Sequence, residues 1–199
     1  MLTGLILTGG ASTRMGSPKA LLSDPEGRPF ILRIIDVFAA AARDRLDQIV
    51  IVAGVHHDEI VTVLDASDPA LPVRLVRNPD PARGQLSSIW SGLDAMSAST
   101  DGVLMTLVDV PMVAPATVRA VIDAWSRTRS PVVRPICDGR RGHPVIFDHA
   151  VVGELRAAPL DQGARVVVRA HWNDSVDVPV EDRGCLIDID TPDDYERLL

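Results

Sequence analysis

The chain has 199 residues, of which 46% are hydrophobic and 24% are charged, and its formal net charge is −7. This length favours one domain, residues 1–199, with a sizeable core. The acidic balance argues against a nucleic-acid partner, and no apolar run approaches the roughly 20 residues that span a bilayer, so no membrane partner is expected. Two distant cysteines, Cys137 and Cys185, and the lack of a basic leader segment favour a reduced, cytoplasmic protein without a disulfide or zinc site.

Apolar patterning predicts alternating strands and helices through the first two thirds of the chain. Near-continuous apolar runs, typical of parallel strands covered on both faces, occupy residues 2–7, 48–53 and 102–108, and a further short strand is predicted at 73–77. Apolar residues spaced three and four apart predict helices over 30–46, 58–66, 85–96 and 116–125. The expected fold is therefore α/β.

The last third departs from this alternation. Residues 132–136 and 143–147 predict two antiparallel strands joined by a turn over 138–142. Two helical pieces separated near Pro159 follow over 149–171, then short strands at 175–180 and 186–189 and a closing helix at 192–199. Together the elements predict a three-layer α/β/α domain with a mostly parallel, Rossmann-like sheet and a small antiparallel excursion.

The first strand leads into a glycine- and hydroxyl-rich segment that ends in a basic residue. It reads Thr8-Gly9-Gly10-Ala11-Ser12-Thr13-Arg14-Met15-Gly16-Ser17-Pro18-Lys19. Small residues let backbone N–H groups approach phosphate oxygens, and Arg14 and Lys19 add positive charge, so we interpret it as a nucleoside triphosphate site. The Walker loop and the dinucleotide fingerprint do not fit its spacing. A tight turn without a ligand is the alternative interpretation.

Acidic residues end two further segments. Asp109 follows the strand at 102–108 and precedes Pro111, which cannot extend a central strand. A turn-forming acid is the alternative reading of Asp109. Asp188 and Asp190 lie two apart on a predicted strand and therefore share one face.

The segment from Leu5 to Lys19 closely resembles the signature of sugar-nucleotide and molybdenum-cofactor nucleotidyltransferases. The whole chain resembles the molybdopterin cytidylyltransferase-like branch of that superfamily. The further matching motifs are Gly84-Gln85-Leu86-Ser87-Ser88-Ile89, Asp109-Val110-Pro111, Gly142-His143-Pro144, Asp161-Gln162-Gly163-Ala164-Arg165 and Asp188-Ile189-Asp190-Thr191-Pro192.

This resemblance implies roles for the residues of the motifs. Arg14 and Lys19 would neutralise the triphosphate, and Asp109 with Asp190 would hold Mg²⁺, with Asp188 as the alternative to Asp190. Magnesium prefers a few carboxylates together with phosphate oxygens and water, which agrees with this set. The implied catalytic residues are Arg14, Lys19 and Asp109. The implied reaction is in-line attack of an acceptor phosphate on the α-phosphorus, with pyrophosphate leaving.

The binding residues come from the opening loop, from the start of the helix at 85–96 and from the last third of the chain. The expected set is Leu7, Thr8, Gly9, Gly10, Ala11, Ser12, Arg14, Lys19, Gly84, Ser87, Ser88 and His143. By the resemblance His143 would lie near the acceptor, and an ordinary strand-start histidine is the alternative. Arg140 and Arg141 are expected in an exposed turn outside the site.

The nucleotide and the acceptor are less sharply indicated. Relatives of the cytidylyl branch carry Ala-Ala-Gly where this chain has Thr8-Gly9-Gly10, which resembles the guanylyl branch. The later motifs favour CTP, with GTP as the alternative. The expected acceptor is phosphorylated and molybdopterin-like, with a molybdoenzyme as a recipient of the product. A dinucleotide-dependent oxidoreductase and a non-catalytic cofactor-delivery protein are the alternatives from other classes.

Overall fold

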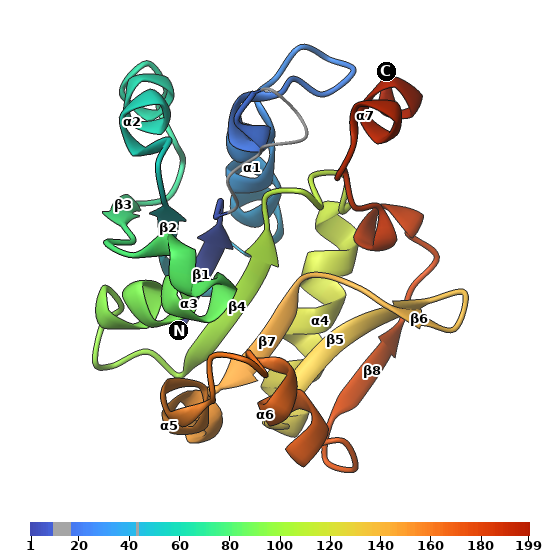
Figure 1. Ribbon diagram of the computed structural model, residues 1–199. Coiled ribbons are helices and arrows are strands. Elements are labelled where there is room, and N and C mark those ends of the chain that lie inside the picture. The colour runs from blue at the N-terminus through green and yellow to red at the C-terminus, as the bar shows by residue number, and fades with distance from the viewer. Residues whose placement is uncertain (10–16, 43) are drawn as a thin grey trace.

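One mixed sheet organises the molecule (Figure 1). The computed structural model describes residues 1–9, 17–42 and 44–199. Within them the strands run in the order β3-β2-β1-β4-β7-β5-β6, and β8 pairs with β5 beside this path. Their bounds are β1 (Leu2–Leu7), β2 (Leu46–Ala53), β3 (Val73–Arg77), β4 (Gly102–Leu107), β5 (Val132–Cys137), β6 (Arg140–Arg141), β7 (Val145–Asp148) and β8 (Val176–Pro179).

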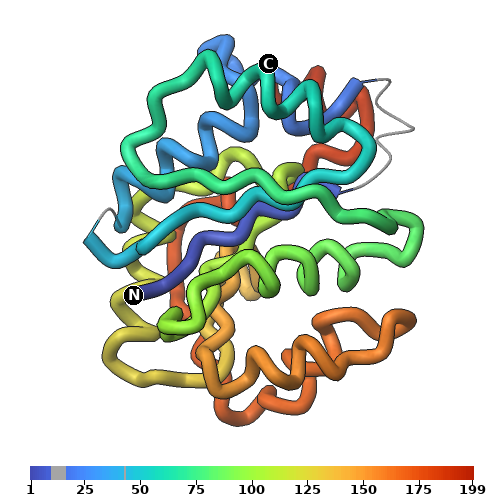
Figure 2. Tube along the Cα trace, turned by 90° about the vertical axis from the view of Figure 1, so that its left-hand side faces the viewer, coloured from blue at the N-terminus to red at the C-terminus, as the bar shows by residue number. Residues whose placement is uncertain are grey.

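Helices cover both faces of the sheet, which Figure 2 shows almost edge-on. One face packs against α1 (Phe30–Ala42), α2 (His57–Asp65), α4 (Pro115–Thr128) and α7 (Pro192–Leu198). The other face packs against α3 (Gln85–Asp94), α5 (His149–Ala157) and α6 (Arg165–Ala170). The predicted three-layer α/β/α architecture is therefore confirmed.

Burial explains why the central strands read as continuous apolar runs. All six residues of β1 are buried, with Leu2 and Ile6 in the core under α1 and α4, and Leu5 and Leu7 in the core under α3 and α5. A strand covered on both faces needs apolar side chains at successive positions. β1, β2, β3 and β4 pair in parallel, so their carboxyl ends meet at one edge of the sheet.

The predicted antiparallel part of the sheet is present, and the structure shows how its strands pair. β7 lies antiparallel between β4 and β5, and β5 turns directly into β6. Asp138 (φ 49°) and Gly139 (φ 73°) form the two-residue turn between β5 and β6. Positive φ at both central residues is what the tight turns of hairpins require.

Two predicted elements need correction. The helix predicted over 30–46 ends at Ala42, because Leu46 pairs with Leu2 at the start of β2. The strand predicted at 186–189 is not formed. Its first residue, Leu186, ends the short 3-10 helix η3 (Arg183–Leu186), and the N–H of Ile189 donates to the carbonyl of Asp109 instead of a strand partner.

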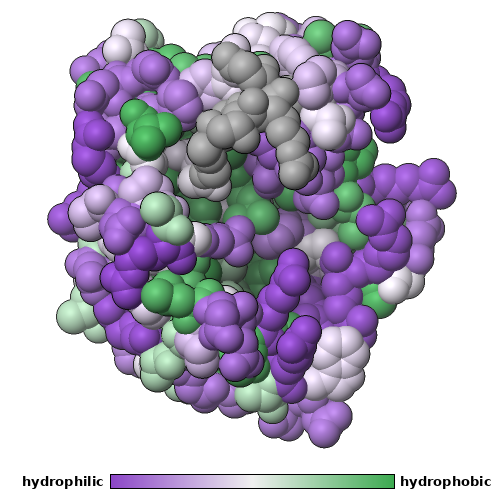
Figure 3. Space-filling model, in the orientation of Figure 1, coloured by the Kyte–Doolittle hydropathy of each residue, from purple (hydrophilic) through white to green (hydrophobic). Residues whose placement is uncertain are grey.

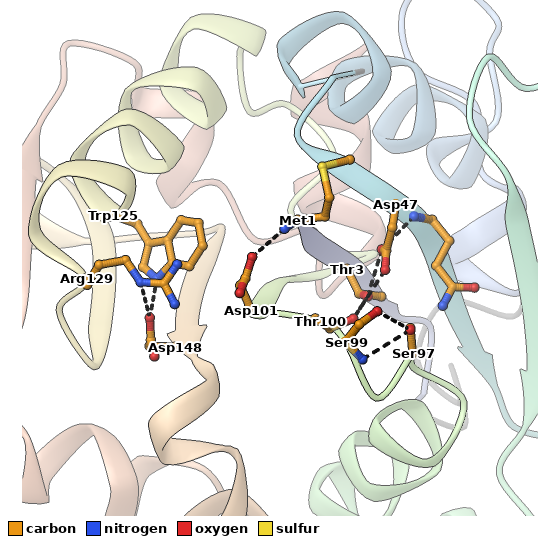
Figure 4. Close-up of polar contacts among 11 residues, drawn as sticks. Met1, Thr3, Asp47, Ser97, Ser99, Thr100, Asp101, Trp125, Arg129 and Asp148 are labelled. Carbon is orange, nitrogen blue, oxygen red and sulfur yellow. Dashed lines mark hydrogen bonds and ion pairs between the residues drawn. The ribbon is translucent and has the colours of Figure 1, made fainter.

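Polar contacts join the amino ends of the central strands, opposite the edge where the parallel strands end (Figure 4). The Asp47 carboxylate accepts from the hydroxyls of Thr3 (2.9 Å) and Thr100 (3.2 Å), and the amino group of Met1 pairs with Asp101. Within the described residues, no helix is long and apolar enough to cross a bilayer.

Candidate active site

The carboxyl ends of β1 and β4 bring Leu7 and Thr8 close to the segment that carries Asp109. Leu7 pairs with Leu107 in the ladder, and the N–H of Val108 donates to the carbonyl of Leu7 (3.0 Å). Thr8 is fixed by its own N–H and its hydroxyl, both of which donate to the carbonyl of Val52 (3.0 Å each). Of the predicted loop residues, Leu7, Thr8, Gly9 and Lys19 are described. Gly10, Ala11, Ser12 and Arg14 lie outside the described residues.

Lys19 joins the two predicted metal-binding acids. It begins η1 (Lys19–Leu21), and its Nζ lies 2.5 Å from Oδ1 of Asp190 and 3.3 Å from Oδ2 of Asp109. Only 15% of the Lys19 side chain is exposed. Three segments that are far apart in the sequence therefore meet at one ammonium group.

Backbone contacts hold the two acids in place. The N–H of Ile189 donates to the carbonyl of Asp109 (2.8 Å), which brings the segment carrying Asp190 alongside the end of β4. Asp194 completes a capping box with Thr191 at the start of α7, and its carboxylate also accepts from the N–H of Asp190 (3.3 Å).

Asp188 belongs to the same carboxylate cluster. Burial raises the pKa of Asp188 above its usual value, and the negative charges of Asp109 and Asp190 raise it further, whereas Lys19 and Arg140 act in the opposite direction. Of Asp188 and Asp190, Asp190 is the one that contacts Lys19.

This donor set fits a magnesium ion that also binds phosphate. Oδ1 of Asp109 is buried and has no hydrogen-bond partner among the described residues. In the described part of the chain, no three His, Cys, Asp or Glu side chains stand close enough to form a metal cage. Magnesium does not need one, because it is commonly held by one or two carboxylates, substrate phosphates and water.

His143 is largely buried, and the charge of Asp109 acts on its ring. Burial lowers the pKa of His143 below its usual value, and the negative charge of Asp109 opposes that shift. Its Nδ1 is buried without a hydrogen-bond partner among the residues that the structure describes. Because burial outweighs both the charge of Asp109 and a backbone hydrogen bond at Met105, the lowered pKa leaves the imidazole neutral near pH 7.

A second group of predicted residues lies where β3 ends and α3 begins. Asn78 donates its side-chain amide to the hydroxyls of Ser87 (2.8 Å) and Ser88 (3.0 Å). A Cβ on Gly9 would lie 3.0 Å from Oγ of Ser88, so the opening segment passes close to this helix start. Gly84 adopts φ 87° at the N-cap of α3.

Asn78 was not predicted as a site residue, although the sequence holds a signal for it. It is the first residue after β3, and the carboxyl ends of parallel strands are where polar side chains gather around ligands. Ser87 also donates to the carbonyl of Gly84 (2.7 Å), so its hydroxyl is engaged within the protein. Ligand contact by Gly84, Ser87 and Ser88 stays a prediction.

Comparisons with known proteins agree with this geometry. The chain is 26% identical over 192 residues to the molybdenum cofactor cytidylyltransferase of Escherichia coli strain K12, covering 96% of this chain and 92% of that protein. It is 31% identical over 172 residues to a probable molybdenum cofactor guanylyltransferase of Rhodopirellula baltica, covering 85% and 75%.

Solved structures show the same architecture. The crystal structure of Rv0371c from Mycobacterium tuberculosis superposes with a TM-score of 0.82 at 28% identity, covering 100% of this chain and 98% of that one. That protein has also been solved in complex with manganese. The model of the MobA-like NTP transferase domain matches residues 4–176. The chain therefore belongs to the family of MobA-like NTP transferase domains and is a nucleotidyltransferase.

Proposed function

We propose that the protein transfers a nucleoside monophosphate from CTP to the phosphate group of molybdopterin and releases pyrophosphate, with GTP as the alternative donor. The observation that carries this proposal is the contact of Lys19 with Asp109 and Asp190 at the carboxyl edge of the sheet. One cation between two acids, beside the carboxyl end of β1, suits a triphosphate with its divalent metal ion.

The residues of the chain act by position and charge. Lys19, with Arg14 of the opening segment, would neutralise the leaving pyrophosphate, while Asp109 and Asp190 would hold Mg²⁺. The bound ion would add positive charge where negative charge develops in the transition state. A phosphate monoester is largely ionised at neutral pH, so the acceptor needs no general base to become a nucleophile. The neutral ring of His143, on which the charge of Asp109 acts, is consistent with that reading.

The assignments of the nucleotide base and of the acceptor are supported by the relatives rather than by the site alone. Both curated relatives named above act in molybdenum cofactor nucleotidyl transfer by name, which supports molybdopterin as the acceptor. The cytidylyltransferase of Escherichia coli matches at 26% identity over 96% of this chain, which supports CTP, and the guanylyltransferase of Rhodopirellula baltica matches at 31% over 85%, which supports GTP as the alternative. The pair Gly9-Gly10 is the feature that favours GTP. Membership of a nucleotidyltransferase family argues against the dinucleotide-dependent oxidoreductase.

The test is release of pyrophosphate in the presence of molybdopterin and Mg²⁺, with each of the four ribonucleoside triphosphates in turn. We expect turnover with CTP, and a loss of roughly 10²-fold or more in kcat/KM for Asp109→Asn and Lys19→Ala, because each removes charge stabilisation at the reacting phosphates. Turnover with GTP alone would select the alternative donor.

The matched control is Asp123→Asn. Asp123 lies on α4 and pairs with Arg45, away from the carboxyl edge of the sheet, so its loss should leave pyrophosphate release unchanged. Wild-type turnover in both site variants would contradict the proposed mechanism. Nucleotide binding without pyrophosphate release from any of the four nucleotides would favour a cofactor-delivery protein instead.

A further inference from the structure

An exposed tryptophan flanked by two arginines stands on the antiparallel side of the sheet. Trp172 follows α6 and is 51% exposed, although large apolar side chains are usually covered. The guanidinium carbon of Arg141 lies 4.2 Å from the centre of its ring, and that of Arg134 lies 5.2 Å away. We call Trp172, Arg134, Arg141 and Asp177 the arginine–tryptophan platform.

Hydrogen bonds to Asp177 hold the two arginines of the platform in place. Arg134 on β5 and Asp177 on β8 are paired in register, and Nε of Arg134 donates to Oδ1 of Asp177 (2.8 Å). Nε of Arg141 donates to Oδ2 of the same carboxylate (2.9 Å). Burial would raise the pKa of Asp177, but hydrogen bonds and charge from the two arginines outweigh it and lower that pKa. Two cations therefore face one fixed anion, which leaves positive charge beside the indole.

The turn that carries Trp172 is fixed as well. The hydroxyl of Ser175 donates to the carbonyl of His171 (2.6 Å), which closes the turn around the tryptophan. The ring of His171 contacts the Glu154 carboxylate on α5 (2.9 Å). The exposed ring is therefore an ordered surface rather than the end of a loose segment.

The platform is connected to the carboxylate cluster by a short stretch of chain. Arg141 and His143 are two residues apart, a span of at most about 7 Å. The N–H of His143 donates to the carbonyl of Cys185 in η3 (2.9 Å). The chain after η3 carries Asp188 and Asp190, and the N–H of Ile189 between them donates to the carbonyl of Asp109 (2.8 Å). The stretch from Arg141 to His143 thus connects the platform with the segment that carries the acids.

The platform shares a face of the sheet with α3 and α6. Val133 points into the core under α1 and α4, so Arg134, the next residue on β5, points to the opposite face. Figure 3 views this face and shows a hollow with a hydrophobic floor and a hydrophilic rim. A molecule lying in that hollow has the carboxyl edge of the sheet above it and the antiparallel strands beside it (Figure 1).

We propose that the arginine–tryptophan platform binds the flat nitrogen heterocycle of the acceptor, a pterin, by stacking on Trp172 and by hydrogen bonds from Arg141, so that its phosphate reaches Asp109. This inference rests on the proposed function, because it assigns the acceptor end of the same site. An indole offers an apolar face to any planar ring, and a guanidinium donates in the plane of ring oxygens and anionic substituents. Arg140 and Arg141 are exposed next to a turn, as the sequence predicts, and the proposal adds Arg141 to the acceptor end of the site.

The test uses pterin-6-carboxylate as a probe and follows its fluorescence on titration with the full-length protein. We expect Trp172→Ala and Arg141→Gln to raise the Kd for the probe by about tenfold or more, and Trp172→Phe to raise it less, because a phenyl ring still stacks. Arg156→Gln is the matched control, since Arg156 has a similar exposure and pairs with Asp94 on α3. The Kd for CTP should stay the same in all four variants.

Steady-state kinetics gives an independent reading. The same variants should raise KM for molybdopterin about tenfold and leave KM for CTP unchanged. Trp172→Phe and circular dichroism guard against loss of fold. Three results would each overturn the proposed binding of the heterocycle, even where pyrophosphate is released. They are wild-type probe affinity in Trp172→Ala, no probe binding by the wild type at millimolar concentration, and competition between CTP and the probe. Loss of probe binding in the variants without any pyrophosphate release would overturn the proposed function and leave heterocycle binding in place.

Discussion

At the scale of single residues, the side chain between Asp109 and Asp190 is the only lysine in the chain. The other members of the 20 Lys and Arg residues are all arginines. A guanidinium is planar and binds in a fork, whereas an ammonium is a compact charge with three rotatable donors. The compact ammonium of lysine suits a site in which one cation contacts carboxylates on two sides.

The single lysine makes a direct labelling experiment possible. We expect CTP with Mg²⁺ to slow the acylation of Lys19 by an amine-reactive reagent several-fold, because the triphosphate would cover the ammonium group. Peptide mapping by mass spectrometry measures the rate at each amine. The amino group of Met1 is the internal control, since it pairs with Asp101 at the opposite edge of the sheet. Equal labelling of Lys19 with and without nucleotide would count against a role at the phosphates.

At the scale of elements, two glycines let η3 pass close to its neighbours. A Cβ on Gly142 would lie 2.2 Å from the carbonyl oxygen of Cys185, and one on Gly184 would lie 2.0 Å from the carbonyl oxygen of Met112. Asp182 adds to this contact by accepting from Ala114 N–H (2.8 Å) at the start of α4. The segment that leads to Asp190 is therefore packed between β6 and α4.

Gly142→Ala should destabilise the protein by about 1–3 kcal/mol, because the backbone has to move to admit the methyl group. It should also weaken molybdopterin binding, since Gly142 precedes His143 and follows Arg141. Urea unfolding measures the first effect and KM for the acceptor the second. Gly153→Ala is the control, because nothing lies within 4 Å of its Cβ and alanine is favoured in α5. Equal stability of the two variants would show that the packing at Gly142 is looser than described.

At the scale of the whole molecule, interlocking contacts unite the parts of the site. Arg33 on α1 donates from Nε to the carbonyl of Pro111 (3.1 Å) and pairs with Asp24 (2.9 Å). Tyr195 on α7 donates its hydroxyl to the carbonyl of Ser23 (2.9 Å). The segment after Lys19 is thus tied to the segment after Asp109 and to the helix after Asp190.

The Asp24 contact predicts how the stability of the whole fold depends on pH. Burial would raise the pKa of Asp24, but hydrogen bonds from the N–H groups of Arg28 and Glu26 and the pairing with Arg33 lower it below 3.8. A carboxyl group whose pKa is lowered by folding stabilises the folded state above its unfolded pKa, and this contribution disappears as the pH falls through its folded pKa.

Asp24→Asn should therefore cost about 3 kcal/mol at pH 7, because Arg33 loses its buried partner. The difference in unfolding free energy from the wild type should shrink below pH 4. Urea titrations at pH 7, 5 and 3 measure it. Asp36→Asn is the control, since Asp36 pairs with Arg28 at the surface and half of its side chain is exposed. A difference that stays constant down to pH 3 would refute the assignment.

The sequence by itself determined most of the fold, because the information is local. Residues 2–7 read as a buried strand since every position is covered, and α1, α3 and α4 show the spacing of a helix with one buried face. It also singled out Lys19 and Asp109, which follow buried strands, and the resemblance to nucleotidyltransferases added Asp190.

Only the tertiary structure decided how these parts meet. The contact of Lys19 with Asp190 joins residues 171 apart, and the hydrogen bonds of Asn78 to Ser87 and Ser88 depend on where β3 ends beside α3. The segment 186–189 has strand-like residues but no strand partner, and Trp172 meets Arg141 only because β6 and the turn after α6 pack together. Periodicity reports the backbone conformation and the buried face of each element, whereas contacts between distant side chains follow from sheet order and packing.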